Sequence, residues 1–218
     1  MDTPTAPTDA PKHYLSGREN WQAGAMAGGS KTRDDVADVI RAYLDMAYPG
    51  AYEVTKEPAD LKQLYYYHDW KQRPEAYEPT EEVWWDAERG QFLTRRAGKA
   101  VPATGGGCTP DVKIRCKATG RAYFIECKHQ NDAGNAHERA AKYATPSIVG
   151  LIQEMMGCSY HPVGYLFSGT MVDKRKYQLE LRATFAFAGD HLFLWDAART
   201  PAALSSWVER VVLPLLYT

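Results

Sequence analysis

Two short segments in the middle of the chain constrain its fold most strongly, because together they predict a β-hairpin. Residues 111–117 (DVKIRCK) and 121–128 (RAYFIECK) both read as strands rich in β-branched and aromatic residues. The Ala-Thr-Gly tripeptide between them suits a tight turn. Because side chains alternate between the two faces of a strand, Glu126 and Lys128 are expected on one face and Cys127 on the other.

The predicted hairpin brings three charged side chains to one place. A turn at Thr119-Gly120 would pair Asp111 with Lys128, on the diagonal to Glu126. Two carboxylates and one amine are then expected to converge. A hairpin with unconnected surface charges is the alternative, because Pro-Asp followed at a distance by Glu-x-Lys is a common pattern.

Converging carboxylates suit a metal-assisted hydrolysis. Mg²⁺ prefers carboxylate oxygens and keeps several of its waters. Asp111 and Glu126, with the backbone carbonyl of Cys127, are the candidate ligands, and a metal there would lower the pKa of a bound water. Lys128 is the candidate to position that water or to neutralise charge that develops on a phosphate.

A predicted helix begins a few residues beyond this hairpin. Asn135 suits the N-cap, and Glu138 three positions later completes a capping-box-like arrangement. Asn135 and Arg139 also carry the donors and acceptors that read base edges in the major groove of DNA. An ordinary capped helix is the alternative interpretation.

Four groups of residues in this region carry a resemblance to a known family. They are Pro110-Asp111, then Glu126-Cys127-Lys128-His129-Gln130, then Gly134-Asn135-Ala136 with Glu138-Arg139, and finally Tyr160 to Gly169. The passage from Thr109 to Gly169 resembles the EcoRI/MunI-type restriction endonucleases of the PD-(D/E)xK superfamily. The charged triad is generic to that superfamily, whereas Gly-Asn-Ala-x-Glu-Arg is much more specific.

The resemblance implies a homodimer that cuts both strands of a palindromic DNA duplex by Mg²⁺-dependent hydrolysis and leaves four-nucleotide 5′ overhangs. Asp111 and Glu126 match the metal-binding carboxylates, and Lys128 matches the catalytic lysine. A companion DNA methyltransferase is also expected, because such an enzyme would otherwise cut its own genome.

The resemblance further implies which residues read the DNA sequence. Asn135, Ala136 and Arg139, in the element that Gly134 opens, match the segment that reads an inner AATT. Glu138 matches the acid that links this recognition network to its neighbours. Readers of the outer base pairs stay open, with His129, Gln130 and the basic run Lys174-Arg175-Lys176 as candidates.

Two other functions compete with this interpretation. A structure-specific nuclease of the same superfamily, such as a junction resolvase, would read DNA shape rather than bases. A non-cleaving DNA-binding protein of the same fold would keep the reader without the reaction. The base-reading element argues against the first, and the presence of all three triad residues argues against the second.

The rest of the chain predicts an α/β fold with a mixed β-sheet sandwiched by helices. Residues 1–30, rich in Pro, Thr, Ala and Gly, are expected to form a mobile arm, and residues 31–218 a single nuclease domain. The other predicted elements are a helix that starts near Thr32 and ends at Pro49-Gly50, aromatic packing over 51–90, a flexible lead at 104–107, a helix over 146–156, a strand over 163–167, an amphipathic segment over 171–181, a strand over 191–195 and a helix from Pro201 that Pro214 kinks or ends.

Composition bounds the class of protein. A net charge of -1 argues against coating nucleic acid by bulk charge, although residues 91–180 hold 13 Lys and Arg against 7 Asp and Glu. The N-terminus lacks the pattern of a secretory signal, and no apolar run is long enough for a membrane span. The four cysteines lack zinc-ligand spacing, so free thiols in a reducing cytoplasm are expected. The resemblance implies a prokaryotic or phage-encoded protein.

Overall fold

The computed structural model describes residues 13–130, 145–196 and 198–217, with side chains described from residue 28 onward. Two sheets form, in the orders β1-β5-β6-β7-β8 and β2-β3-β4. The strands are β1 (Tyr52–Lys56), β2 (Val83–Asp86), β3 (Gln91–Arg96), β4 (Lys99–Pro102), β5 (Val112–Cys116), β6 (Ala122–His129), β7 (Val163–Ser168) and β8 (Leu192–Trp195). The α-helices are α1 (His13–Ala47), α2 (Leu64–Gln72), α4 (Pro146–Met156), α5 (Arg175–Thr184), α6 (Pro201–Trp207) and α7 (Leu213–Tyr217).

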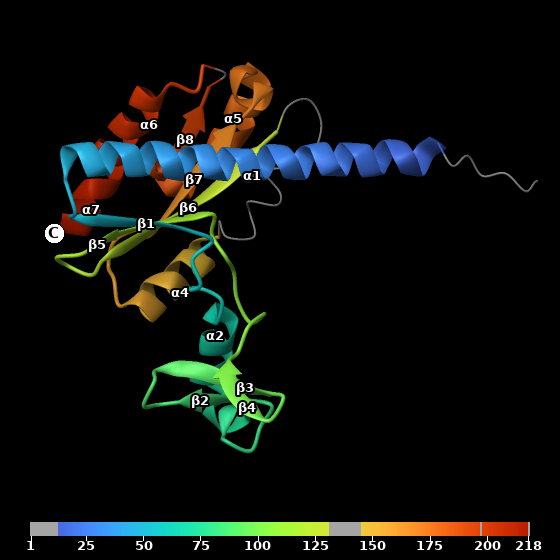
Figure 1. The fold of residues 1–218 in the computed structure, drawn as a ribbon, viewed down its shortest axis with the longest axis vertical. Helices are drawn as coiled ribbons and strands as arrows, with labels where there is room; N and C mark the ends of the chain where they lie inside the picture. The colour runs from blue at the N-terminus through green and yellow to red at the C-terminus, as the bar shows by residue number, and fades with distance from the viewer. Residues whose placement is uncertain (1–12, 131–144, 197, 218) are drawn as a thin grey trace, which may run out of the picture.

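The larger sheet is mixed and lies between two layers of helices, as predicted. Strands β1, β5 and β6 pair antiparallel, whereas β6, β7 and β8 run parallel. Helices α1, α6 and α7 pack on one face around a buried core, and α2, α4 and α5 contribute to a second core on the other face (Figure 1). Among the described helices, none has a stretch long and apolar enough to cross a membrane.

The predicted hairpin is present, but its pairing differs by two residues from the prediction. Val112 pairs with Ile125, and the backbone amide of Asp111 donates to the Ile125 carbonyl at 3.1 Å. The prediction that Asp111 lies opposite Lys128 is therefore wrong. Extending the observed pairing by one step places Asp111 across from Glu126.

A longer turn causes this shift. The Cys116 amide donates to the Arg121 carbonyl at 2.9 Å, so four residues, 117–120, form the loop instead of the predicted two. The Gly120 amide closes the loop on the Cys116 carbonyl at 2.9 Å, and Gly120 adopts a φ of 74°. A side chain at that position would be strained, which explains the glycine.

The first helix begins much earlier than predicted. α1 starts at His13, and Thr32, the predicted start, is fully buried within it. Residues 13–30 are thus helical rather than an irregular arm, while residues 1–12 lie outside the described residues. The N-terminal end of α1 projects beyond the sheet in Figure 1. The predicted end before Pro49-Gly50 is confirmed, because α1 ends at Ala47.

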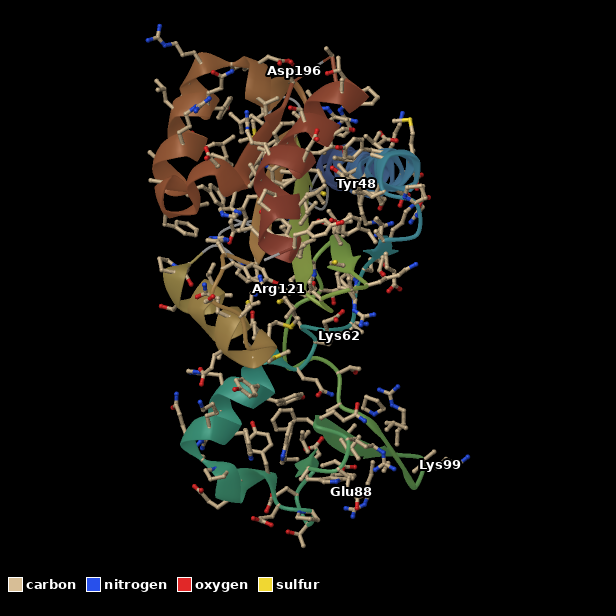
Figure 2. The ribbon with its side chains drawn as sticks, turned by 90° about the vertical axis from the view of Figure 1, so that its left-hand side faces the viewer. Tyr48, Lys62, Glu88, Lys99, Arg121 and Asp196 are labelled. Carbon is tan, nitrogen blue, oxygen red and sulfur yellow. The ribbon has the colours of Figure 1, made fainter. Side chains whose placement is uncertain are left out.

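The aromatic residues of the 51–90 region pack against one another, as favoured from the sequence. Trp70 stacks on Trp85 with ring centroids 4.8 Å apart, and Trp85 lies 4.8 Å from Phe92. This cluster joins α2 to the small sheet β2-β3-β4, the end of the molecule that Glu88 and Lys99 mark in Figure 2.

The second half of the glycine segment at 104–107 is tightly packed. A Cβ on Gly107 would lie 2.0 Å from the Leu61 carbonyl oxygen, and one on Gly106 would lie 2.2 Å from the Tyr66 ring. The Cys108 amide also donates to the Leu61 carbonyl at 2.9 Å. Gly106 and Gly107 permit a close backbone approach, whereas Thr104 and Gly105 are exposed.

The C-terminal elements follow the prediction closely. α4 has the predicted bounds, with the Thr145 hydroxyl accepting from the Ile148 amide at 3.2 Å and Gly157 as a left-handed C-cap. The last helix is interrupted before Pro214, because a π-helical turn over Val208–Val212 separates α6 from α7. Proline has no N–H to donate to the preceding turn, which is consistent with the change of hydrogen bonding there.

Candidate active site

The structure brings the three predicted triad residues together on the β5-β6 hairpin. The backbone amide of Cys127 donates to Asp111 Oδ2 at 2.7 Å. On the neighbouring strand, Lys128 Nζ donates to Glu126 Oε1. The convergence survives the error in pairing because a shift of two residues keeps every side chain on its own face of the strand.

Burial and charge together set the protonation of the site. Glu126 is only 4% exposed. Burial raises the pKa of the Asp111 carboxyl, while the Lys128 ammonium and the Cys127 amide oppose that rise. Burial alone would lower the pKa of Lys128, but the carboxylates of Glu126 and Asp111 outweigh it, so the pKa of Lys128 is raised. The lysine is therefore held as an ammonium ion against two acids.

The donor set fits a hard divalent cation. Asp111 and Glu126 offer carboxylate oxygens, the ligands that Mg²⁺ prefers, and the Cys127 amide orients the first of them. Among the described residues, no group of three or more His, Cys, Asp and Glu side chains converges. Two carboxylates with the other positions left to water and substrate oxygens are typical of Mg²⁺ sites rather than of all-protein cages.

Two further charged residues reach the site from α1 and from the end of β1, and the sequence did not reveal them. The Glu57 amide donates to the Asp111 carbonyl at 2.9 Å, and Arg33 Nη1 donates to Glu57 Oε1. Arg33 lowers the pKa of Asp111, and Glu57 raises it. Glu57 has a φ of 48°, uncommon for a residue other than glycine. No local motif marks either residue, because only the fold brings them to Asp111.

The candidates for reading outer base pairs are placed differently from one another. The His129 ring is half-buried and faces Ser168, with its Nδ1 3.1 Å from the serine hydroxyl. Gln130 is buried, and its amide donates to the Ser168 carbonyl at 3.0 Å. Lys174, Arg175 and Lys176 are exposed at the beginning of α5. Of these candidates, the basic run is exposed, His129 is half-buried and Gln130 is buried.

The predicted base-reading element lies outside the described residues. This applies to Gly134, Asn135, Ala136, Glu138 and Arg139, and to the predicted helix cap at Asn135. Their roles stay predictions.

Three comparisons with known proteins agree with one another. The family model described as "Type II restriction enzyme MunI" matches residues 10–217. The Type II restriction enzyme MunI from Mycoplasma sp is 25% identical over 197 residues, which cover 84% of this chain and 88% of that protein. The crystal structure of MunI restriction endonuclease in complex with cognate DNA aligns at a TM-score of 0.58 and 19% identity, covering 81% of this chain and 89% of the other.

The structural match establishes the shared fold, and the family model extends over almost the whole described chain. The hairpin, the mixed sheet and the converging triad lie within the matched residues. The chain therefore belongs to the MunI family of type II restriction enzymes.

Proposed function

We propose that this type II restriction endonuclease hydrolyses phosphodiester bonds of double-stranded DNA with Mg²⁺ at a palindrome that has an AATT core, leaving 5′ overhangs. The observation that carries the proposal is the convergence of Asp111, Glu126 and Lys128 on one hairpin. Two carboxylates and an ammonium ion at one point are the groups that metal-assisted phosphodiester hydrolysis requires.

Asp111 and Glu126 would hold the cation, which when bound supplies charge to polarise the phosphate and lowers the pKa of a coordinated water. The Cys127 amide keeps the Asp111 carboxylate in one orientation before substrate arrives. The buried Glu126 carboxylate holds the Lys128 ammonium near the reacting atoms. That ammonium can donate to the attacking water or to a phosphate oxygen, so that charge developing on the phosphate is neutralised by a group already in place.

The proposed target rests on the resemblance of Gly134, Asn135, Ala136, Glu138 and Arg139 to an AATT-reading element. The solved MunI structure is a complex with cognate DNA, which supports duplex DNA as the substrate of this relative. A palindrome presents the same sequence on both strands, so two copies of the chain, related by a two-fold axis, are proposed as the cutting unit. A cognate DNA methyltransferase is the proposed functional partner.

The test is a digest of duplex DNA of known sequence, with and without Mg²⁺, followed by sequencing of the cut ends. Discrete fragments with AATT overhangs that form only with Mg²⁺ would bear out the proposal and reveal the flanking bases. Discrete cuts at another sequence would refute the assigned target and keep the nuclease. Binding without cleavage by folded protein, with Mn²⁺ also tried, would favour a non-cleaving binder, and cleavage of branched DNA alone would favour a resolvase.

A further inference from the structure

Arg199, in the segment after β8, reaches the carboxyl ends of two neighbouring strands and α1. Its Nη2 lies 2.7 Å from His129 Nδ1, 2.8 Å from Ser168 Oγ and 2.9 Å from Thr32 Oγ1. His129 ends β6 and Ser168 ends β7, whereas Thr32 belongs to α1. One guanidinium nitrogen thus meets three separate elements at the edge where the catalytic strand ends.

The opposite side of the His129 ring is closed by a glycine of α1. A Cβ on Gly28 would lie 2.8 Å from His129 Cδ2, a distance at which one of the two must move. Gly29, the next residue of the same helix, has nothing within 4 Å of its Cβ position. The imidazole is therefore seated between Gly28 on one side and Ser168 and Arg199 on the other.

This arrangement is costly, which indicates that it does more than fill space. Thr32 and Ser168 are fully buried, and the Arg199 side chain is 24% exposed. Among the described residues, Asp35 at 3.4 Å is the one carboxylate within ion-pair distance of this guanidinium. Arg199 also adopts a φ of 44°, a left-handed conformation that costs a residue with a side chain free energy.

The contacts of Gly28, Ser168 and Arg199 hold the residue that directly follows the catalytic lysine. Lys128 directly precedes His129 on β6, so a displacement of the imidazole is transmitted through one peptide unit to the lysine backbone. The other neighbour, Gln130, is tied to β7 through its amide on the Ser168 carbonyl at 3.0 Å. Fixing His129 therefore fixes the end of β6 on which Lys128 is carried.

We infer that Arg199 and Gly28 are positioning residues that seat the His129 ring between α1, β7 and the segment after β8, and so set the place of Lys128 for cleavage. Neither residue touches the reacting atoms. The inference rests on the proposed DNA cleavage and names residues that this function did not include.

The test compares two matched pairs of variants in the full-length protein. Gly28→Ala and Gly29→Ala make the same change on adjacent positions of α1, and both favour the helix, so a defect in one alone reports the contact with His129. Arg199→Ala is paired with Arg210→Ala, which removes the same charge from an exposed position. The readout is the single-turnover cleavage rate constant at saturating cognate DNA and Mg²⁺, normalised to the folded fraction, beside the Kd for the same DNA measured with Ca²⁺.

We expect Gly28→Ala and Arg199→Ala each to lower that rate constant by about 10–100-fold, as small misplacements of catalytic groups do, with less change in Kd. Gly29→Ala and Arg210→Ala should match the wild type. Arg199→Lys should recover only part of the rate, since an ammonium on a flexible stem lacks the planar geometry of the guanidinium.

Normal rate constants per folded molecule in both Gly28→Ala and Arg199→Ala, with lowered thermal stability, would overturn the inference and leave a structural role. So would equal losses in the control variants. If the wild-type protein itself does not cut DNA, the proposed function fails. The wild-type measurement therefore distinguishes failure of the proposed function from failure of the positioning role.

Discussion

The two edges of the parallel strands β6, β7 and β8 bury polar side chains in opposite ways. At the carboxyl edge, Glu126 and Lys128 stay charged because each is the other's partner. At the amino edge, Tyr123, His161 and His191 form a neutral group. Figure 1 shows α1 crossing in front of these strands. The same sheet therefore holds a charged cluster at one end and an uncharged one at the other.

Aromatic stacking and one hydrogen bond hold the amino edge. The rings of His161 and His191 stack with centroids 4.3 Å apart, and the Tyr123 hydroxyl lies 2.7 Å from His191 Nδ1. Burial, and then the neighbouring His161, lower the pKa of His191 to about 4. At His191 burial outweighs the opposing charge of Asp190, whereas at Lys128 the carboxylates outweigh burial and the charge that chemistry needs is retained.

The largest effect is expected from Lys128→Ala at the charged edge. Removing the ammonium should lower the single-turnover cleavage rate by about 10²–10³-fold, the usual loss for one electrostatic group aimed at developing charge. Binding to cognate DNA should persist. Rate and affinity are measured on the same preparation, and unimpaired cleavage would show that the charge at this edge is not used in the reaction.

A smaller effect is expected from overpacking the neutral edge with Gly164→Ala. The new Cβ would lie 2.7 Å from Tyr123 Oη and 2.8 Å from Trp207 Cη2, so the free energy of unfolding should fall by about 1–3 kcal/mol. Gly150→Ala is the control, because nothing lies within 4 Å of that Cβ position. Urea denaturation compares the two, and equal stabilities would mean that the neutral edge is loosely packed.

The smallest effect is expected on the pH dependence of the free energy of unfolding. The folded-state pKa values of His161 and His191 lie below the unfolded value, so the unfolded chain takes up protons first as the pH falls. Stability should decline from about pH 6.5, the unfolded pKa of histidine, towards pH 4. His161→Phe should flatten this decline by less than about 1.4 kcal/mol per pH unit, because solvent reaches part of the ring.

That decline is measured as the free energy of unfolding against pH for the wild type and His161→Phe. Subtracting the two curves removes the common contribution of the carboxyl groups. Superimposable slopes would mean that His161 is not held neutral in the folded protein.

Local periodicity predicted the β5-β6 hairpin and the elements after residue 145, but not β1, α2 or the small sheet β2-β3-β4. The helix over 146–156 has the predicted bounds because an N-cap, an apolar stripe and a glycine stop all agree. The faces of Glu126 and Lys128 were predicted because a strand alternates every two residues. The bounds of α1 were wrong at its start, since the Thr32 signal resembles a cap but lies in a buried part of a longer helix.

The three triad residues of the candidate site were predicted from the sequence, but the residues around them were not. Asp111, Glu126 and Lys128 lie within one hairpin, so a local pattern could identify them. Arg33 and Glu57 could not be found in this way, because their relation to Asp111 arises when α1 and β1 pack on the hairpin.

The hairpin, the face of each charged side chain and the family could all be inferred from the amino-acid sequence, because they depend on neighbours within a few residues or on a motif. The folded structure was needed to establish the pairing of Asp111 and the contacts that hold the His129 ring. The four-residue loop sets the first. The contacts around His129 include a hydrogen bond from Arg199 to Thr32, which lie 167 positions apart in the chain. Sequence periodicity gives no information about a contact over that separation, because the contact forms only when the elements pack together.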